Sequence, residues 1–97
     1  MTIQLQEQQQ NNAVVLLKAM ANERRLEILY HLLEKDEMCV GEMNQKLGLS
    51  QSALSQHLAW LRKDQLVTTR KEAQTVYYSL KSSKVRKMIG LLDDLYQ

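Results

Sequence analysis

Apolar side chains recur every three or four positions over most of this chain, which is the spacing of amphipathic helices. The pattern begins at Ala13 and reaches Met20, and it restarts after Asn22, a residue suited to cap a helix, to end at Leu33. Residues 1–12 are polar, rich in Gln and without periodicity, so we expect them to form a flexible lead. The first part of the chain therefore predicts two consecutive helices after a polar terminus.

Two further helices are predicted on either side of a tight turn. Cys39 occupies the position of a capping Ser or Thr, and Glu42 completes a capping box at the start of a short helix. Gly48 can adopt the left-handed conformation that ends this helix, and Ser50 caps the next one, over residues 51–63. A short helix, a Gly-Leu-Ser turn and a second helix are typical of a helix-turn-helix.

The helix over residues 51–63 has two contrasting faces. Leu54, Leu58 and Leu61 share one side and are predicted to face the core. Small and polar residues fall on the opposite side: Ser52, Ser55, Gln56, Ala59 and Lys63. A low face with paired hydrogen-bond donors and acceptors is what a helix needs to approach base edges in the major groove of duplex DNA.

The remainder of the chain predicts a β-hairpin and a last helix. Residues 66–71 and 75–80 are rich in β-branched and aromatic side chains, with Val76, Tyr78 and Leu80 alternating inward. The connection Glu72-Ala73-Gln74 has no Gly, so we expect a loop longer than two residues. From Ser83 an apolar stripe predicts the last helix: Val85, Met88, Ile89, Leu92, Leu95 and Tyr96. The fold is thus mainly α with a small hairpin, in the order ααααββα.

Composition limits the chain to one globular domain, which we assign to residues 13–97. The 97 residues are 44% hydrophobic and 25% charged, as in ordinary globular proteins. The longest apolar stretch, residues 13–17, is far too short to cross a bilayer, and no signal peptide opens the chain. We therefore expect a cytoplasmic protein with no membrane partner. The single cysteine, Cys39, cannot form an internal disulfide.

The net charge of the chain is weak evidence for a polyanionic partner, and the distribution of the basic residues is stronger evidence. The net charge is only +2, but Arg62, Lys63, Arg70 and Lys71 lie close together in sequence, opposed by Asp64 alone. The four Tyr, one Trp and no Phe are too few for the stacking platforms of single-strand binders, so duplex DNA fits better than RNA. The predicted DNA contacts are Ser50, Gln51, Ser52, Ser55, Gln56, Lys63, Arg70, Lys71, Gln74 and Thr75.

An enzyme is not indicated, because the sequence has no nucleophile with a convergent base, no paired carboxylates and no glycine-rich phosphate loop. A protein-interaction module is the more serious rival, since folds of this kind can be reused in that way. His57 falls toward the core side of its helix and is expected to be a packed residue. Trp60 is expected to be partly covered.

Several runs resemble the ArsR (SmtB/ArsR) family of bacterial winged-helix repressors: residues 17–29, 40–42, 49–58 and 76–80. The resemblance implies a winged helix-turn-helix that forms a homodimer through its first and last helices and reads a pseudo-palindromic promoter site. The apolar stripes on those helices supply the expected dimer contacts: Leu16, Leu17, Met20, Met88, Leu92 and Leu95. Residues 13–20, 56–62 and 70–78 are similar to a subgroup of haemolysin-gene regulators of vibrios. That similarity implies activation of virulence genes by displacement of a nucleoid silencing protein.

The family's usual sensors are missing from this sequence. Metal-sensing members carry Cys-x-Cys at the third helix, where this chain has Cys39 but Gly41, and residues 83–97 contain no His. Relatives that close a regulatory disulfide have Cys where this chain has Tyr30 and Gln97. No metal and no cofactor are therefore expected. Cys39 remains open to two interpretations, a semi-buried substitute for Ser or an oxidisable thiol in a redox-responsive repressor.

Overall fold

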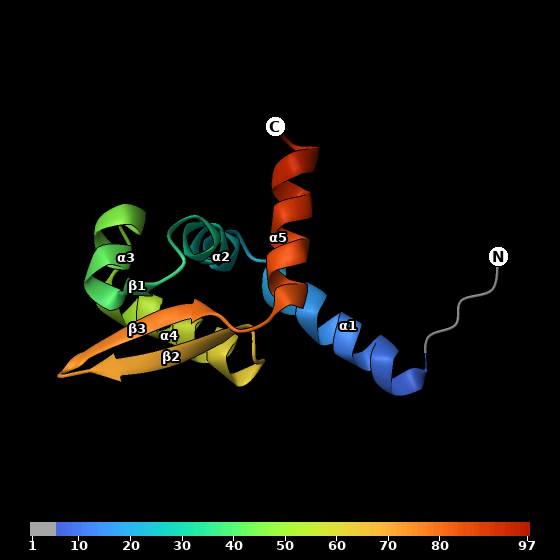
Figure 1. The fold of residues 1–97 in the computed structure, drawn as a ribbon, viewed down its shortest axis with the longest axis horizontal. Helices are drawn as coiled ribbons and strands as arrows, with labels where there is room; N and C mark the ends of the chain where they lie inside the picture. The colour runs from blue at the N-terminus through green and yellow to red at the C-terminus, as the bar shows by residue number, and fades with distance from the viewer. Residues whose placement is uncertain (1–5) are drawn as a thin grey trace.

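The computed structural model describes residues 6–97, and on them it places five helices and a three-stranded sheet (Figure 1). The bounds of the elements are α1 Glu7–Met20, α2 Glu23–Lys35, β1 Met38–Cys39, α3 Val40–Leu47, α4 Gln51–Lys63, β2 Val67–Glu72, β3 Thr75–Leu80 and α5 Ser83–Leu95. The predicted order of helices and hairpin is confirmed, with β1 added to it.

The first helix begins at Glu7 and not at Ala13, so the prediction of a flexible lead over residues 1–12 is wrong for residues 7–12. Gln6 and Gln9 close the N-terminus of α1, where the Gln6 backbone N–H donates to Gln9 Oε1 at 3.0 Å. This capping box has no Ser or Thr, so the usual sequence signal for the start of a helix is missing. Residues 1–5, the rest of the predicted lead, lie outside the described residues.

Local capping fixes the helix-turn-helix as predicted. The Asn22 side chain accepts from the Arg25 backbone N–H at 3.0 Å at the start of α2. At α3 the Cys39 backbone N–H donates to Glu42 Oε1 at 3.1 Å. Gly48 ends α3 at φ 67°, and Ser50 Oγ accepts from the Ala53 backbone N–H at 3.1 Å to start α4. These short contacts set the turn between α3 and α4.

The sheet has the strand order β1-β3-β2, with all neighbours antiparallel. Strand β1 consists of two residues, which pair with Tyr77 and Tyr78, and sequence periodicity cannot reveal so short a strand. The prediction of a longer hairpin loop is wrong: Glu72 pairs with Thr75, which leaves Ala73 and Gln74 as a two-residue turn. Ala73 takes the positive φ of 55° that such turns usually assign to Gly.

The core gathers around α2, which contacts each of the other helices and β3. Its largest fully buried side chains come from α2, α3, α4, α5, β1, β2 and the connection between α4 and β2: Ile28, Leu29, Leu32, Met38, Met43, Leu54, Leu58, Leu61, Leu66, Ile89 and Val67. The inward positions predicted on α4, Leu54, Leu58 and Leu61, are confirmed. In Figure 1, α1 and α5 lie on the far side of α2 from α3, and the turn between β2 and β3 points away from α1.

Candidate nucleic-acid interface

The outer side of α4 is a continuous small and polar surface, which we call the reading face: Gln51, Ser52, Ser55, Gln56, Ala59 and Lys63. All of these residues are exposed, because Leu54, Leu58 and Leu61 turn the opposite side of the helix into the core. Within residues 6–97, Gln51, Ser55 and Gln56 make no side-chain hydrogen bond or ion pair. Their donors and acceptors are therefore directed to solvent.

The N-terminus of α4 combines a polar cap with an uncompensated helix dipole. Ser50 is exposed, and its Oγ lies 3.4 Å from Ser52 Oγ. The first turn of α4 carries no acidic side chain, whereas Arg62 and Lys63 in the last turn complement the negative end of the dipole. A helix N-terminus without a carboxylate nearby is favourable for a phosphate group.

The hairpin of β2 and β3, which we call the wing, lies beside the reading face. Tyr78 of β3 and four residues of α4 line a shallow hollow between them: Ser55, Ala59, Arg62 and Lys63. Strand alternation places Lys71 on the same face of the sheet as Tyr78, since Lys71 pairs with Val76 and Thr69 with Tyr78. Lys71, Gln74 and Thr75 are exposed near the wing turn.

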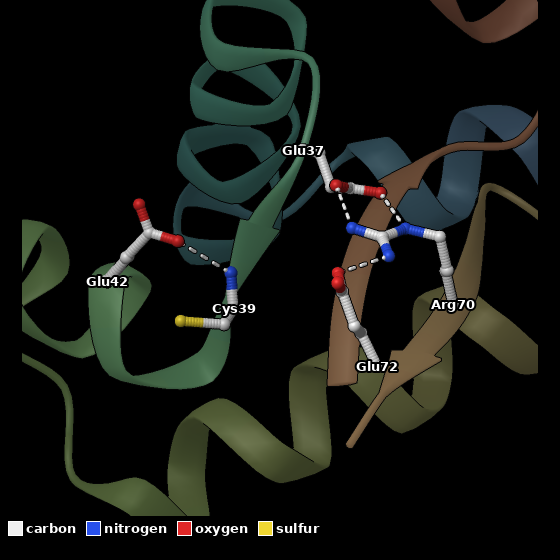
Figure 2. Close-up of polar contacts among 5 residues, drawn as sticks. All are labelled: Glu37, Cys39, Glu42, Arg70 and Glu72. Atoms are coloured by element: carbon white, nitrogen blue, oxygen red, sulfur yellow. Dashed lines mark hydrogen bonds and ion pairs between the residues drawn. The ribbon is translucent and has the colours of Figure 1, made fainter. Parts of the chain in front are cut away.

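Arg70 is adjacent to Lys71 in sequence but lies on the opposite face of the sheet, where it pairs with Tyr77. Its Nη2 and Nε donate to the two oxygens of Glu37 at 2.7 and 3.0 Å, and its Nη1 donates to Glu72 Oε2 at 2.8 Å (Figure 2). The Arg70 guanidinium lowers the pKa of Glu37, and the two carboxylates raise the pKa of Arg70. The structure thus separates Arg70 from Lys71, whereas Thr75, which pairs with Glu72, lies on the Arg70 face. Nothing in the sequence indicated that Glu37 would be a partner of Arg70.

The flank of α4 that faces α2 carries His57 and Trp60. His57 is half-buried, as predicted, and this burial, with Arg25 and Arg24 nearby, lowers the pKa of its imidazole. Trp60 is 53% exposed and lies against the Arg25 guanidinium, 4.8 Å from the ring centroid. The Arg25 Nε donates to the Ala19 carbonyl oxygen at 2.8 Å, so this cation is fixed by the end of α1.

The six residues predicted for a dimer interface do not share one environment. Met20 is only 5% exposed and belongs to the chain's own core. Leu16, Met88 and Leu92 are partly buried against the core, whereas Leu17 and Leu95 are 53% and 63% exposed. The prediction missed further exposed apolar side chains on α1 and α5: Val14, Val15 and Leu91. The four-residue spacing of Leu91 and Leu95 was the available signal.

Cys39 is half-buried at the junction of β1 and α3. Its side chain lines a hollow with residues of α3 and of the wing turn: Val40, Gly41, Gln74, Thr75 and Val76.

Within residues 6–97, no three His, Cys, Asp or Glu side chains gather in a group that would hold a metal ion. None of the helices over the same residues has the length and apolar character required to span a membrane.

Comparison with known proteins places these features in a family. Residues 22–69 match the family described as bacterial regulatory protein, arsR family. The chain is 66% identical over 94 residues to the transcriptional activator HlyU of Vibrio cholerae, covering 95% of this chain and 86% of that protein. It is 56% identical over 84 residues to the nodulation protein NolR of Rhizobium meliloti, covering 87% and 68% of the two chains. The solved structure of HlyU from Vibrio cholerae N16961 superimposes with a TM-score of 0.89 at 65% identity, covering 94% of this chain and 98% of that one.

Proposed function

Because the chain belongs to the ArsR family of bacterial regulatory proteins, whose members are transcriptional regulators and not enzymes, we propose that it reads a pseudo-palindromic duplex DNA site as a homodimer. The observation that carries this proposal is the reading face of α4, which is exposed, free of internal side-chain hydrogen bonds at Gln51, Ser55 and Gln56, and capped by Ser50. Apolar packing on the other side of α4 fixes the orientation of this face.

Base readout falls to the two glutamines of the reading face. A Gln side chain can pair with adenine through its amide donor and carbonyl acceptor, and Gln51 and Gln56 both lie in the N-terminal half of α4, the part that enters the major groove in this fold. Ser50, Ser52 and Ser55 have hydroxyl groups that suit bases or phosphates. The side chain of Ala59 is small enough to let the helix approach the bases closely.

Phosphate contacts fall to the cations around the reading face. Lys63 ends α4 beside the hollow that Tyr78 lines, and Lys71 lies on the same face of the wing as Tyr78. Gln74 and Thr75 at the wing turn are exposed and polar, so they suit backbone or minor-groove contacts. Arg70 was predicted to join this set, but its guanidinium already forms ion pairs with Glu37 and Glu72.

Two copies of the chain are needed to read two half-sites. The exposed apolar side chains on α1 and α5 support a dimer through these helices. Such a dimer would place one α4 in each of two half-sites, which are spaced by about 34 Å, one turn of DNA, in sites of this kind. A relative with 66% identity is named a transcriptional activator. We extend this role to the present chain as activation of virulence genes by displacement of a silencing protein on the bacterial nucleoid.

Selection of bound sites from a pool of random duplexes tests the proposal. The wild-type chain should retain related duplexes with two similar half-sites, and its affinity for them should fall steeply as salt rises. In Gln56→Ala, affinity for the selected duplex should fall by about 1–3 kcal/mol, and specificity should relax at one base position in each half-site. Binding to unselected duplex should change little.

Gln8→Ala is the matched control, since Gln8 is an exposed glutamine in the first turn of α1, away from the reading face. It should bind the selected duplex like the wild type. If no duplex is enriched, or if both substitutions have the same effect, the role of the reading face is wrong. The chain would then be a protein-interaction module.

A redox-responsive repressor is a second candidate, which the position of Cys39 favours. This thiol lines a hollow against the wing turn, so an oxidised sulfur at this position would place an additional polar group beside Gln74, Thr75 and Val76. The response would need no metal.

A further inference from the structure

The Glu37–Arg70 pair joins the two outer strands of the sheet. Glu37 precedes β1, Arg70 lies in β2, and β3 runs between them. The Arg70 guanidinium passes over the ring of Tyr77, its cross-strand neighbour, at 4.6 Å from the centroid, and ends on both oxygens of Glu37. This side chain therefore connects residues that are 33 positions apart in sequence.

Strand β1 has few other attachments to the wing. It pairs with β3 at only two positions, Met38 with Tyr78 and Cys39 with Tyr77. Since α3 follows β1 directly, this short contact joins the wing to the start of the helix-turn-helix, in addition to the packing of β2 on α4 and of β3 on α2 and α3. A bidentate arginine–carboxylate pair also has a defined geometry, which a single contact between point charges lacks.

The charge around Arg70 does not favour a phosphate. One guanidinium faces two carboxylates, and each of its three nitrogens donates to one of them. An approaching phosphate would meet a net acidic cluster and would have to replace an existing ion pair. Arg70 also lies on the sheet face opposite Lys71 and Tyr78, away from the hollow that borders the reading face.

We propose that Arg70 and Glu37 form a clamp that positions the wing against the helix-turn-helix, and that Arg70 does not contact DNA phosphate. The proposal rests on the proposed DNA-binding function. It assigns a role in DNA recognition to an acidic residue, Glu37, that would not itself touch DNA. Lys71 then remains as the cation of the wing that contacts the backbone.

The variant Glu37→Gln separates the two roles by the sign of its effect. If the clamp positions the wing, removal of the ion pair should weaken binding to the selected duplex by about two- to fivefold, the range of exposed ion pairs, although a negative charge has been removed. If Arg70 contacts phosphate, Glu37→Gln should instead strengthen binding, because the guanidinium is released from one competing carboxylate. Unchanged or tighter binding overturns the proposal.

Glu72→Gln is the matched control. It removes the same charge from the same guanidinium but leaves the connection to β1 intact, because Glu72 and Arg70 belong to one strand. Binding should therefore stay unchanged or tighten slightly. A decrease in affinity equal to that of Glu37→Gln would contradict a clamp between strands.

Arg70→Lys provides a second variant that keeps the positive charge. Lys is a good phosphate ligand but cannot make the bidentate pair, so the clamp predicts the same weakening as in Glu37→Gln with an unchanged salt dependence. In Lys71→Gln, by contrast, the slope of log affinity against log salt should fall by about 0.9 for each phosphate that the lysine neutralises in the wild type. A near wild-type affinity of Arg70→Lys would identify Arg70 as a phosphate ligand.

Amide hydrogen exchange without DNA separates the clamp from the function on which it rests. In Glu37→Gln and Arg70→Lys, the amides of β1 and β2 should exchange faster than in the wild type, while those of α2 and α4 stay protected. If the amides of β1 and β2 exchange at the same rate in these variants as in the wild type, the clamp proposal is overturned, even if DNA binding is found. If the wild type enriches no duplex, the proposed function fails, and the exchange data still decide whether the clamp exists.

Discussion

At the scale of single residues, Cys39 links the backbone of the helix-turn-helix to the wing. Its N–H is bound by Glu42 at the start of α3, and this contact lowers the pKa of the Glu42 carboxyl. The thiol meanwhile shares a hollow with Gln74, Thr75 and Val76. A modified sulfur would therefore change the surroundings of the wing turn while the capping contact of Glu42 to the backbone can persist (Figure 2).

We predict that hydrogen peroxide weakens DNA binding of the wild type but not of Cys39→Ser. The Cys39 thiolate would attack one peroxide oxygen, the O–O bond would break, and hydroxide would leave to give a sulfenic acid. Titration of the selected duplex before and after peroxide, followed by reduction with excess thiol, measures the effect. The untreated serine variant should bind like the wild type, because Ser preserves the small polar side chain at this helix start.

Equal responses of the two proteins to peroxide, or no response of either, would remove the redox-responsive repressor as a candidate. The reduction step also distinguishes damage from switching, since excess thiol restores only a reversible oxidation state. A decrease in affinity that thiol does not reverse would therefore count as damage. In that case Cys39 is a semi-buried substitute for Ser.

At the scale of elements, the junctions depend on residues in the left-handed region. Four connections contain one: Asp36 after α2, Gly48 after α3, Gln65 after α4 and Ala73 in the wing turn. Only Gly48 is a glycine, so the other three adopt a conformation that L side chains disfavour. Packing of the joined elements must hold them in place.

The backbone angle φ should decide whether exchange between glycine and alanine stabilises or destabilises the protein. Gly48→Ala should lower the free energy of unfolding by about 1–2 kcal/mol, because φ is 67° there although no atom obstructs a Cβ. Gly41→Ala in α3 is the matched control: its Cβ also meets open space and its φ is not positive, so a gain of about 0.5–1 kcal/mol is expected. Ala73→Gly should relieve the strain at φ 55° and stabilise the wing turn.

Denaturant unfolding of the three variants measures these effects. A destabilised Gly41→Ala, or a stabilised Gly48→Ala, would show that backbone conformation does not control these junctions. DNA binding supplies a second readout for Gly48, because this residue sets the turn that places the reading face. Gly48→Ala should weaken binding more than Gly41→Ala does.

The elements that the sequence predicted are those determined by neighbours in the chain. Asn22, Gly48 and Ser50 act within a few residues of themselves, so the bounds of α4 and the reading face followed from local rules. Glu37 was not predicted as a partner of Arg70, because their contact spans 33 positions. The length of the wing turn was mispredicted for a related reason. Tertiary packing holds Ala73 at a positive φ, which alanine does not prefer, so the sequence did not indicate a two-residue turn.

At the scale of the whole molecule, uncovered apolar side chains concentrate on two helices. Val14, Val15 and Leu17 are exposed on α1, and Leu91 and Leu95 are exposed on α5, with Tyr96 directly after it. In Figure 1 these two helices lie together at one side of the molecule, away from α3 and the wing turn. The apolar helices therefore lie apart from α3 and the wing turn, whereas Lys63 at the end of the reading face lines a hollow together with Val15 and Leu16 of α1.

The residues predicted for the interface from the apolar stripes differ in exposure, although both helices carry exposed apolar side chains. A stripe with helical spacing contains residues that pack inside the chain and residues that project from it, and the sequence does not separate the two groups. Met20 belongs to the first group, and Leu17 and Leu95 belong to the second. The assignment required the tertiary structure, in which α2 covers one side of α1 and of α5.

The proposed dimer predicts that one charge on α5 dissociates the protein without unfolding it. In Leu95→Glu, an exposed apolar side chain becomes ionised, so burial against a second copy would require removing a carboxylate from water. Sedimentation at micromolar concentration should give twice the chain mass of 11.3 kDa for the wild type and the single mass for the variant. Ser83→Glu is the control, because it adds the same charge to the other end of the same helix, where the dipole favours it.

The monomeric variant should keep its helix content but bind the two-half-site duplex far more weakly, since each half-site must then be bound independently. A wild type that sediments as a monomer, or a Leu95→Glu variant that remains dimeric, contradicts pairing through α5.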